Sequence, residues 1–267
     1  MKALGVVSAA LVLAASSAMA ADMAAKAPLR AAPVAYAPSW TGCYVGGGGG
    51  YGLWNQDNTS YNVTTVPRTQ VTGTTTAGGR GYFGTVQGGC DYQFGLGGFN
   101  LVIGAFGDYD WDSLKGNQDV SLLGAYGREK MSSQWSVGGR VGWVVTPNLL
   151  TYFSAGYTEA HFDSVNLLNN FAALGPIGAP TGFFIGSRNY QGYFIGAGDE
   201  YALNFLPGLF WKTEYRFSDL DTQTNPIRIV TTGLPGTFAN DSHKFVHTVR
   251  SELVYRFSWG GPVAAKY

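Results

Sequence analysis

The chain has 267 residues, of which 13% are charged and 15% aromatic, and it contains 39 glycines. Its 17 Lys and Arg residues balance 17 Asp and Glu residues, so no long-range attraction to nucleic acid is expected. After the N-terminal region no apolar run reaches about 18 residues, which excludes a membrane-spanning helix. A composition poor in charge and rich in aromatics and glycine is typical of a membrane β-barrel.

The first 20 residues predict a secretory signal peptide. Lys2 supplies a positive start, residues 3–15 are apolar, and Ala18-Met19-Ala20 is a cleavage site with two small residues. The apolar part is too short to anchor the chain in a membrane. Residues 21–39, which are rich in Ala and Pro, predict an extended periplasmic tether that follows cleavage.

Residues 40–267 are expected to form one outer-membrane β-barrel domain, because they contain eight segments in which apolar and polar residues alternate. These segments are 40–54, 80–94, 99–111, 132–145, 149–162, 189–203, 208–218 and 244–258. A period of two predicts strands with one apolar and one polar face. In the segment 99–111, for example, Leu101 and Ile103 share one face, and Asp108 lies on the other. The segment 149–162 is ambiguous, and no faces are assigned to it.

The connections between these segments alternate between short and long. The short ones, at 95–98, 146–148 and 204–207, carry the Gly and Pro of tight turns. The long ones are polar and comprise residues 55–79, 112–131, 163–188 and 219–243. The predicted fold is therefore all-β, an eight-stranded antiparallel up-and-down transmembrane β-barrel.

The first segment contains five consecutive glycines, Gly46 to Gly50. Alternation places Gly46, Gly48 and Gly50 inward. There they are expected to leave room for large side chains of neighbouring strands, such as Gln87 or Arg250. A phosphate-binding loop would require a following helix, and the sequence predicts none.

Aromatic residues gather toward the ends of the segments. In a bilayer these ends lie in the two headgroup layers, which favour a ring with one polar edge. The residues expected to form these aromatic girdles are Trp40, Trp54, Trp111, Trp135, Trp143 and Trp211. A membrane location also requires ring closure, because every backbone amide in hydrocarbon needs a partner.

Ten charged residues are assigned to the inward face, five of each sign. They are Asp91, Asp108, Arg140, Glu200, Lys212, Glu214, Arg216, Arg250, Glu252 and Arg256. An eight-stranded barrel is just wide enough for its own side chains, and an unpaired buried charge is costly. We therefore expect paired charges that fill most of the lumen. The alternative is a water-filled channel lined by solvated charges.

Cys43 and Cys90 are both assigned to the outward face, near the periplasmic ends of neighbouring antiparallel strands. A disulfide between them is geometrically possible in an oxidising compartment, and the alternative is two buried thiols. Two isolated cysteines do not have the spacing of a metal site, and no metal is expected.

The three histidines, His161, His243 and His247, are expected in solvent near the extracellular rim. On a strand His243 and His247 are about 13 Å apart, so they cannot share a metal ion.

Two sets of carboxylates also alternate toward outer connections. The first set is Asp108, Asp110 and Asp112, and the second is Asp219 and Asp221. They are expected to be solvated loop charges; the alternative is that they bridge divalent cations to anionic lipid headgroups.

An enzyme that modifies lipids would need a nucleophile and a base on the lipid-facing rim. The nearest candidate pairs are His247 with Ser251 and Glu159 with His161, and the first pair is about 13 Å apart along one strand. The sequence therefore predicts no enzymatic activity and no cofactor.

Several segments have a more specific pattern than alternation. They are WTGCYVG (40–46), QGGCDYQ (87–93), GAGDEY (196–201), KTEY (212–215) and HTVRSELVYRFSWGGPVAAKY (247–267). Together with the Ala/Pro-rich stretch before them, they resemble the small outer-membrane immunogenic-protein family of alphaproteobacteria. That family is similar to the eight-stranded transmembrane domain of OmpA, and its members are often called porins.

The resemblance implies an outer-membrane location, antigenic surface loops, and assembly by periplasmic chaperones and the barrel-insertion machinery. Tyr255-Arg256-Phe257 resembles the aromatic signal that the machinery reads, although ten residues follow it. Asp199, within GAGDEY, falls on the outward face, which is unusual for a carboxylate.

The sequence thus predicts an integral outer-membrane protein with a structural and surface-antigen role. Its expected partners are outer-membrane lipids and lipopolysaccharide, the assembly machinery, and host or environmental ligands that contact the loops. A small passive porin-like channel is the second interpretation, and a lipid-modifying enzyme the third.

Overall fold

The computed structural model describes residues 38–120 and 123–257. The expected signal peptide, the tether up to residue 37 and the last ten residues of the chain lie outside the described residues. Within that part of the chain, no helix has the length and apolar character needed to cross a bilayer.

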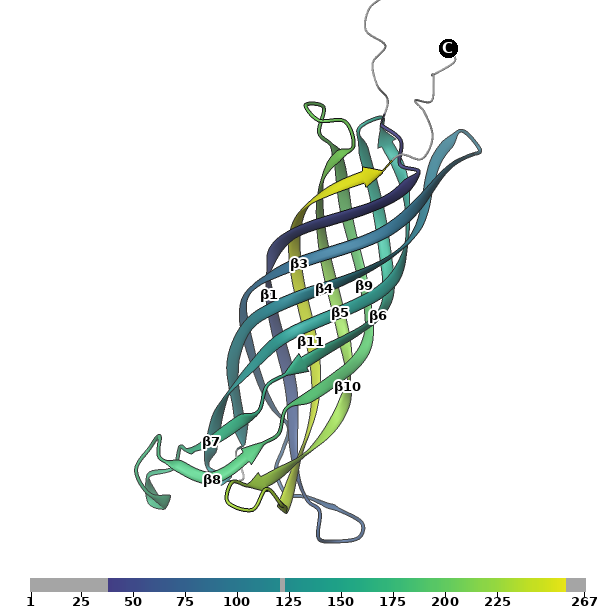
Figure 1. Cartoon of the computed structure of the whole chain (residues 1–267). Helices are drawn as coiled ribbons and strands as arrows, with labels where there is room; N and C mark the ends of the chain where they lie inside the picture. Colours follow the sequence, from purple (N-terminus) through teal and green to yellow (C-terminus); the bar gives the residue numbers. More distant parts are fainter. Residues whose placement is uncertain (1–37, 121–122, 258–267) are drawn as a thin grey trace, which may run out of the picture. The chain divides into compact units, whose positions relative to one another are not determined.

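Eight long strands form the fold. They are β1 (Gly42–Asn62), β3 (Thr75–Leu96), β4 (Phe99–Val120), β5 (Ala125–Thr146), β6 (Leu149–Phe162), β9 (Arg188–Ala202), β10 (Leu209–Ile229) and β11 (Pro235–Phe257). Each pairs antiparallel with the next long strand in the chain. Since β11 also pairs with β1, the pairings pass around a ring (Figure 1). The predicted all-β, antiparallel, up-and-down architecture is confirmed.

Short connections join β3 to β4, β5 to β6 and β9 to β10, as predicted. In the first of them Gly97 and Gly98 have φ values of 59° and 87°, which a two-residue hairpin turn requires and which glycine adopts without strain. The end of the ring that carries these connections is named the short-turn end. The half of the ring farther from it is named the distal half.

Three shorter strands and a 3-10 turn lie in the distal connections. They are β2 (Thr69–Gln70), β7 (Val165–Asn169), the turn Ala172–Leu174 and β8 (Pro180–Ile185). β7 pairs with β5 and β8, and β8 pairs with β10. The hairpin of β7 and β8 therefore continues the wall of the ring beyond the ends of β6 and β9 (Figure 1).

The predicted strand boundaries are correct to about two residues at the short-turn end. In the distal half they are also correct for β6 and β9, and wrong for the other six long strands. Of residues 112–131, predicted as a long connection, 112–120 and 125–131 are strand. Likewise, of residues 219–243, also predicted as a long connection, only 230–234 lie between β10 and β11, and the rest belong to these two strands. The physical reason is that the outward side chains change from apolar to polar along the strands.

Near the short-turn end the outward side chains are apolar, and most of the buried charges lie on the inward face. Ile103 and Val141 are 53% and 54% exposed on the outside, whereas Asp108 is buried inside. In the distal half the outward side chains are polar, as Lys115 is, and the inward ones include both apolar residues such as Leu114 and polar ones such as Gln118. A distal strand therefore has a polar outer face, which in the sequence resembles a loop.

The interior of the ring contains apolar clusters as well as charges. The cluster near the short turns consists of Trp40, Tyr44, Val102, Phe106, Leu150, Tyr152, Phe194, Ala202, Phe210 and Val254. The next is formed by Trp54, Phe83, Leu114, Met131, Ala160, Phe162, Tyr190, Leu220 and Val246. The third, around Val120, Val165 and Ile227, lies among the distal strands. The faces of residues 149–162 are now defined, since Tyr152 is buried inside and Phe153 is exposed outside.

The glycines of β1 allow large groups to approach its inner face. A Cβ atom on Gly46 would lie 2.9 Å from Val254 Cγ2 and 3.3 Å from Gln87 Cγ. One on Gly50 would lie 2.2 Å from the carbonyl oxygen of Val249 and 2.5 Å from Phe83 Cζ. The two predicted neighbours are both confirmed, since Gln87 lies opposite Gly46 and Arg250 lies opposite Gly50, and the ring of Phe83 fills the space nearest Gly50.

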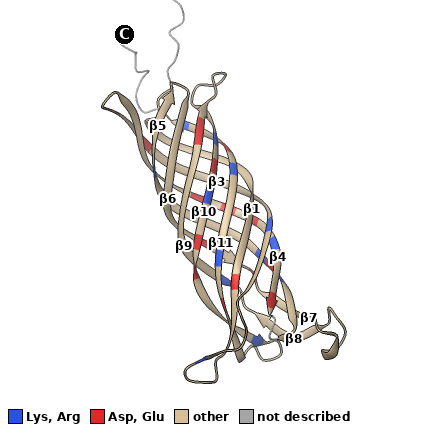
Figure 2. Cartoon of the chain, turned by 180° about the vertical axis from the view of Figure 1, so that it is seen from behind, with Lys and Arg blue, Asp and Glu red and all other residues tan. Residues whose placement is uncertain are grey.

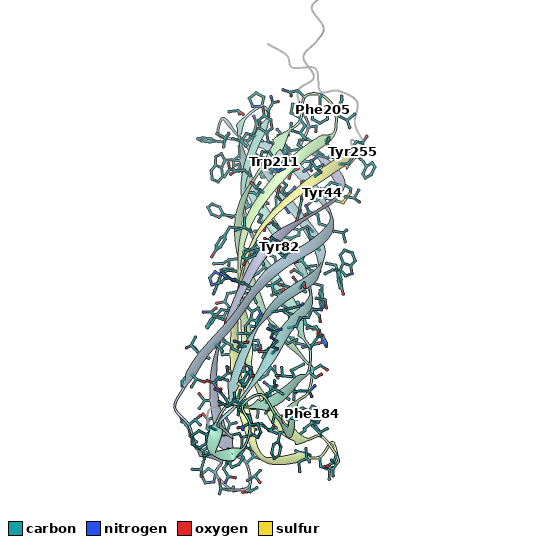
Figure 3. The ribbon with its side chains drawn as sticks, turned by 90° about the vertical axis from the view of Figure 1, so that its left-hand side faces the viewer. Tyr44, Tyr82, Phe184, Phe205, Trp211 and Tyr255 are labelled. Carbon is teal, nitrogen blue, oxygen red and sulfur yellow. A yellow bond between two sulfur atoms is a disulfide. The ribbon has the colours of Figure 1, made fainter. Side chains whose placement is uncertain are left out.

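Four of the six predicted girdle tryptophans lie on the outer surface: Trp111, Trp135, Trp143 and Trp211. Figure 3 shows Trp211, with Phe205 and Tyr255, at the short-turn end. The prediction is wrong for Trp40 and Trp54, which are fully buried inside the ring. Trp40 packs on Phe210, with 4.8 Å between ring centroids, and Trp54 alternates in phase with inward residues of β1.

Candidate functional site: the charged interior of the ring

All ten charged residues that were assigned to the inward face are buried inside the ring. They come from β3 (Asp91), β4 (Asp108), β5 (Arg140), β9 (Glu200), β10 (Lys212, Glu214, Arg216) and β11 (Arg250, Glu252, Arg256). Figure 2 shows that charged positions recur along the strands and are not confined to the connections. The alternation of side chains on each strand is what places them together.

Four of these residues form a cycle near the short turns. Arg140 donates to Asp91 (Nε–Oδ1 3.0 Å) and to Glu200 (Nη1–Oε2 2.9 Å). Arg256 donates to the same two carboxylates, with 2.6 Å to Asp91 Oδ2 and 2.6 Å to Glu200 Oε1. The Tyr44 ring lies 4.8 Å from each guanidinium carbon. Charges of opposite sign alternate around the cycle, so strands that are not neighbours are linked across the lumen.

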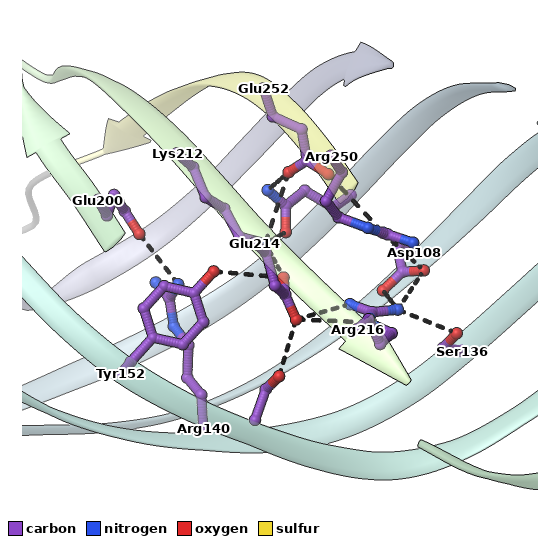
Figure 4. Close-up of polar contacts among 12 residues, drawn as sticks. Asp108, Ser136, Arg140, Tyr152, Glu200, Lys212, Glu214, Arg216, Arg250 and Glu252 are labelled. Atoms are coloured by element: carbon purple, nitrogen blue, oxygen red, sulfur yellow. Dashed lines mark hydrogen bonds and ion pairs between the residues drawn. The ribbon is translucent and has the colours of Figure 1, made fainter. Parts of the chain in front are cut away.

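A second group is centred on Glu214 in the middle of the interior (Figure 4). Lys212 Nζ lies 3.0 Å from one oxygen of Glu214, and Arg216 Nη2 lies 3.3 Å from the other. The hydroxyl of Ser154 donates to Glu214 at 2.7 Å. The hydroxyl of Tyr152 donates to it as well, at 3.2 Å, so Glu214 has two cationic partners and two neutral donors, which offset the cost of its burial.

Basic residues extend this group to the opposite wall. Arg216 Nη1 donates to Asp108 Oδ2 at 3.0 Å, and Arg250 Nη2 donates to Asp110 Oδ2 at 2.8 Å. Lys212 Nζ lies 3.5 Å from Glu252, whose carboxylate also accepts a hydrogen bond from the Gln87 amide. The ten predicted residues thus form two connected groups of ion pairs.

The sequence reasoning missed four buried charges: Asp110, Asp112, Glu129 and Lys244. Asp110 and Asp112 were expected as solvated loop charges. Asp110 is inside the ring because it shares the inward face of Asp108, and Asp112 is inside because β4 continues beyond Trp111. Glu129 was assigned to a connection, and Lys244 was the first residue of a predicted strand. The described interior therefore holds eight acidic and six basic buried side chains.

Lys244 and Glu129 form an isolated ion pair in the distal half, with Nζ–Oε1 at 2.8 Å. The rings of Trp54, Phe162 and Tyr190 surround the ammonium group, with centroids 5.0, 4.3 and 4.8 Å from Nζ. Burial lowers the pKa of Lys244, and the charge of Glu129 acts against that shift. The signal that would have found this pair is the continued period of two through Glu129 and Met131.

Cys43 and Cys90 lie directly opposite each other on β1 and β3 and are joined by a disulfide. Tyr255 and Phe257 lie side by side on the outer surface at the end of β11, with ring centroids 5.2 Å apart. Asp199 faces outward, and its carboxylate accepts a hydrogen bond from Thr151 at 2.6 Å. On the two neighbouring strands the residues directly opposite Asp199 are Thr151 and Thr213, so its neighbours are polar.

The histidines lie on the outer surface with polar partners. His243 Nε2 is 2.7 Å from Asp219, and His247 Nδ1 is 2.8 Å from the hydroxyl of Tyr215. Among residues 38–120 and 123–257, no group of three His, Cys, Asp or Glu side chains is arranged to hold a metal ion.

Neither candidate catalytic pair is assembled in a way that would activate a nucleophile. Ser251 accepts a hydrogen bond from Trp211 Nε1 at 2.8 Å, while His247 contacts Tyr215. Glu159 accepts hydrogen bonds from the amides of Asn189 and Gln191. These side chains are held by groups other than their proposed catalytic partners.

One half of the ring thus shows apolar side chains to its surroundings, and the other half shows polar ones. Such a division suits a protein whose short-turn half lies in lipid and whose distal half lies in water. Proteins of this kind form the class of outer-membrane β-barrel proteins. The chain is 30% identical over 250 residues to the 31 kDa outer-membrane immunogenic protein of Brucella melitensis, an alignment that covers 91% of this chain and 95% of the relative. The protein of the same name from Brucella suis matches equally.

The chain therefore belongs to the family of the 31 kDa outer-membrane immunogenic protein. The predicted family, outer-membrane location and surface-antigen role are confirmed. No family model matches the sequence. Solved structures that resemble this chain include OprG of Pseudomonas aeruginosa, with 12% identity, a TM-score of 0.47 and coverage of 83% of this chain and 100% of OprG. Ail of Yersinia pestis has 12% identity, a TM-score of 0.34 and coverage of 80% and 99%.

Proposed function

We propose that the eight long strands form a closed transmembrane barrel whose short turns face the periplasm. On β4 the apolar outer band runs from Phe99 to Trp111, which corresponds to roughly 30 Å along the membrane normal at a strand tilt of about 40°. On β5 it runs from Trp135 to Val145, or roughly 25 Å. Both values agree with the apolar band of about 25 Å that outer-membrane barrels present to lipid.

The strands are longer than this band requires. β4 and β5 have 22 residues each, whereas a tilted transmembrane strand needs only about 9–11. The distal half, with the hairpin of β7 and β8 at its end, then projects from the cell surface. Exposed apolar residues at the distal tips, such as Val66 and Leu174, are available there for antibodies and other ligands.

The function that this arrangement supports best is structural: a rigid outer-membrane protein that displays its distal half and does not conduct solutes. The observation that carries this proposal is the pairing of Arg140, Arg256, Asp91 and Glu200 across the lumen. Apolar clusters lie on both sides of the charged groups along the interior. Paired charges in a narrow interior hold one another, so they present no continuous path for hydrated ions.

Conductance in planar bilayers tests this proposal. We expect the purified protein to give no steady large conductance. The variant Arg140→Ala/Arg256→Ala removes both cations of the cycle and is expected to produce detectable conductance steps, while Arg68→Ala/Arg228→Ala in the distal half is a control with the same change in charge. A steady conductance of the unmodified protein would establish the porin-like alternative instead.

We propose no catalytic role, since the nucleophile and base candidates contact other residues. For assembly, we propose that Tyr255 and Phe257 form the signal read by the barrel-insertion machinery, because both rings are exposed at the end of the last strand.

A further inference from the structure

Three basic residues form a row on the outside of the ring. In the strand register Arg80 of β3 lies opposite Lys115 of β4, and Lys115 lies opposite Lys130 of β5. The inward neighbours Leu114 and Met131 are fully buried, so the three cations point away from the interior. Opposite residues on adjacent strands are about 5 Å apart, so the row places three positive charges within about 10 Å.

Few acidic side chains of the protein neutralise the positive charge of this row. Among the described residues, neither Arg80 nor Lys115 forms an ion pair, and Lys130 Nζ is 3.9 Å from Asp163 Oδ2. Like charges directly opposite each other destabilise a sheet. An anion that binds to the row would offset this repulsion.

Its position on the ring indicates which anion. The row lies just beyond Tyr82 and Trp111, the last large apolar side chains on the outside of β3 and β4. Two to four residues along a tilted strand correspond to roughly 5–10 Å along the membrane normal. The layer immediately outside the hydrocarbon contains the lipid headgroups.

Outward residues on other strands carry the reverse charge. They include Glu159 on β6, the neighbour of β5, and Asp219 and Asp221 on β10. Asp219 is engaged by His243 and Tyr193. The positive charge is therefore concentrated on β3, β4 and β5, and a bound anion is directed to that side.

We propose that Arg80, Lys115 and Lys130 form a binding site for the phosphate groups of a lipopolysaccharide headgroup. Arg80 supplies the planar fork that binds two phosphate oxygens at once, and the two lysines supply compact charges beside it. The rings of Tyr82 and Trp111 contact the apolar part of the same lipid. This inference rests on the proposed function, because the row faces the outer leaflet only if the ring spans the outer membrane.

The test uses the refolded protein in detergent micelles and measures its binding of bisphosphorylated lipopolysaccharide by native mass spectrometry. Each basic residue near a lipid surface contributes about a fivefold increase in affinity. We expect Arg80→Gln to weaken binding about fivefold and Lys115→Gln/Lys130→Gln about 30-fold. The matched control, Arg68→Gln/Arg228→Gln, removes two cations from the distal end and is expected to change binding by less than about twofold.

Two further probes separate the sources of phosphate. Dephosphorylated lipopolysaccharide is expected to bind the unmodified protein and Lys115→Gln/Lys130→Gln equally and weakly. Inorganic pyrophosphate is expected to compete poorly, because it has no acyl chains to contact Trp111. Competition by pyrophosphate at the same concentration as lipopolysaccharide would overturn the assignment to a lipid headgroup, and equal binding of lipopolysaccharide by all variants would overturn the site.

Failure of the proposed function would appear differently, as a protein that does not insert into lipid vesicles or whose gel mobility does not change on heating. The three side chains are on the outside, so these substitutions are expected to preserve the heat-dependent mobility of the folded ring. If the double variant does not fold, Lys115→Gln alone gives the answer, with an expected loss of about fivefold.

Discussion

Glu200 illustrates how much a single buried charge depends on its neighbours. It is fully buried and accepts hydrogen bonds from both Arg140 and Arg256. Those two guanidinium groups also share Asp91, so any change at one member of the cycle affects the other three.

We expect Glu200→Gln to lower the free energy of unfolding by about 3–5 kcal/mol, because it leaves two buried guanidinium groups with one carboxylate between them. Urea-induced unfolding of the protein in lipid vesicles measures this change. The control is Glu159→Gln on the outer surface, for which we expect a change within about 0.5 kcal/mol. Equal effects of the two substitutions would contradict the pairing described for the interior.

At the same scale, the sequence predicted most of the interior correctly. Alternation alone assigned Arg140 and Arg256 to the inside, because a strand has only two faces. It did not reveal which acid pairs with which base, since that depends on the tilt and register of strands far apart in the chain. It also failed for Trp40 and Trp54, since a tryptophan at a segment end is equally suited to a headgroup layer and to a buried apolar cluster.

At the scale of the strand, the main difference between expectation and structure is the length of the distal strands. Near the short turns, apolar positions are outside and polar positions inside, and the sequence pattern is clear. Beyond Trp111 the inward positions continue with Asp112 and Leu114, but the outward ones become polar, because water replaces lipid outside. A search for one continuous pattern therefore ends at Trp111, although the strand continues to Val120.

The disulfide joins two neighbouring strands near the short-turn end. Cys43 and Cys90 are 47 residues apart in the sequence. In the chain-entropy description, closing a loop of this size raises the free energy of the unfolded chain by about 4 kcal/mol and so stabilises the folded protein. We expect a reductant to lower the urea midpoint correspondingly while the strands remain paired.

The double variant Cys43→Ser/Cys90→Ser is the control for this prediction. It is expected to unfold at the midpoint of the reduced protein and to be insensitive to reductant. Two alkylatable thiols in the unreduced native protein would contradict the bond itself.

At the scale of the whole ring, the change of the outward side chains from apolar to polar divides the protein into a part surrounded by lipid and a part surrounded by water. We expect spin labels at Ile103 and Val141 to be accessible to oxygen, which concentrates in hydrocarbon. Labels at Asn117 and Arg128 are expected to be accessible to a water-soluble nickel complex. The measurement is electron paramagnetic resonance of variants that each carry one added cysteine for the label, while Cys43 and Cys90 remain bonded to each other.

A label at Leu114 serves as the internal control, since its side chain is buried in the ring and is expected to be reached by neither reagent. If Leu114 and Asn117 are both reached by the nickel complex, residues 112–120 are a solvated loop and the distal half of β4 is not a strand.

The pairing of β1 with β11 has a consequence for how the protein is made. These strands are separated by nearly the whole described chain, yet they match in register from Cys43 with Phe257 to Asn62 with Phe238. A ribosome releases β1 before β11, so during synthesis and export the edge of β1 that pairs with β11 waits for its partner. An exposed edge recruits other chains. Truncation before Pro235 would leave two such edges for good, and the product is expected to accumulate as aggregate or be degraded before it reaches the cell surface.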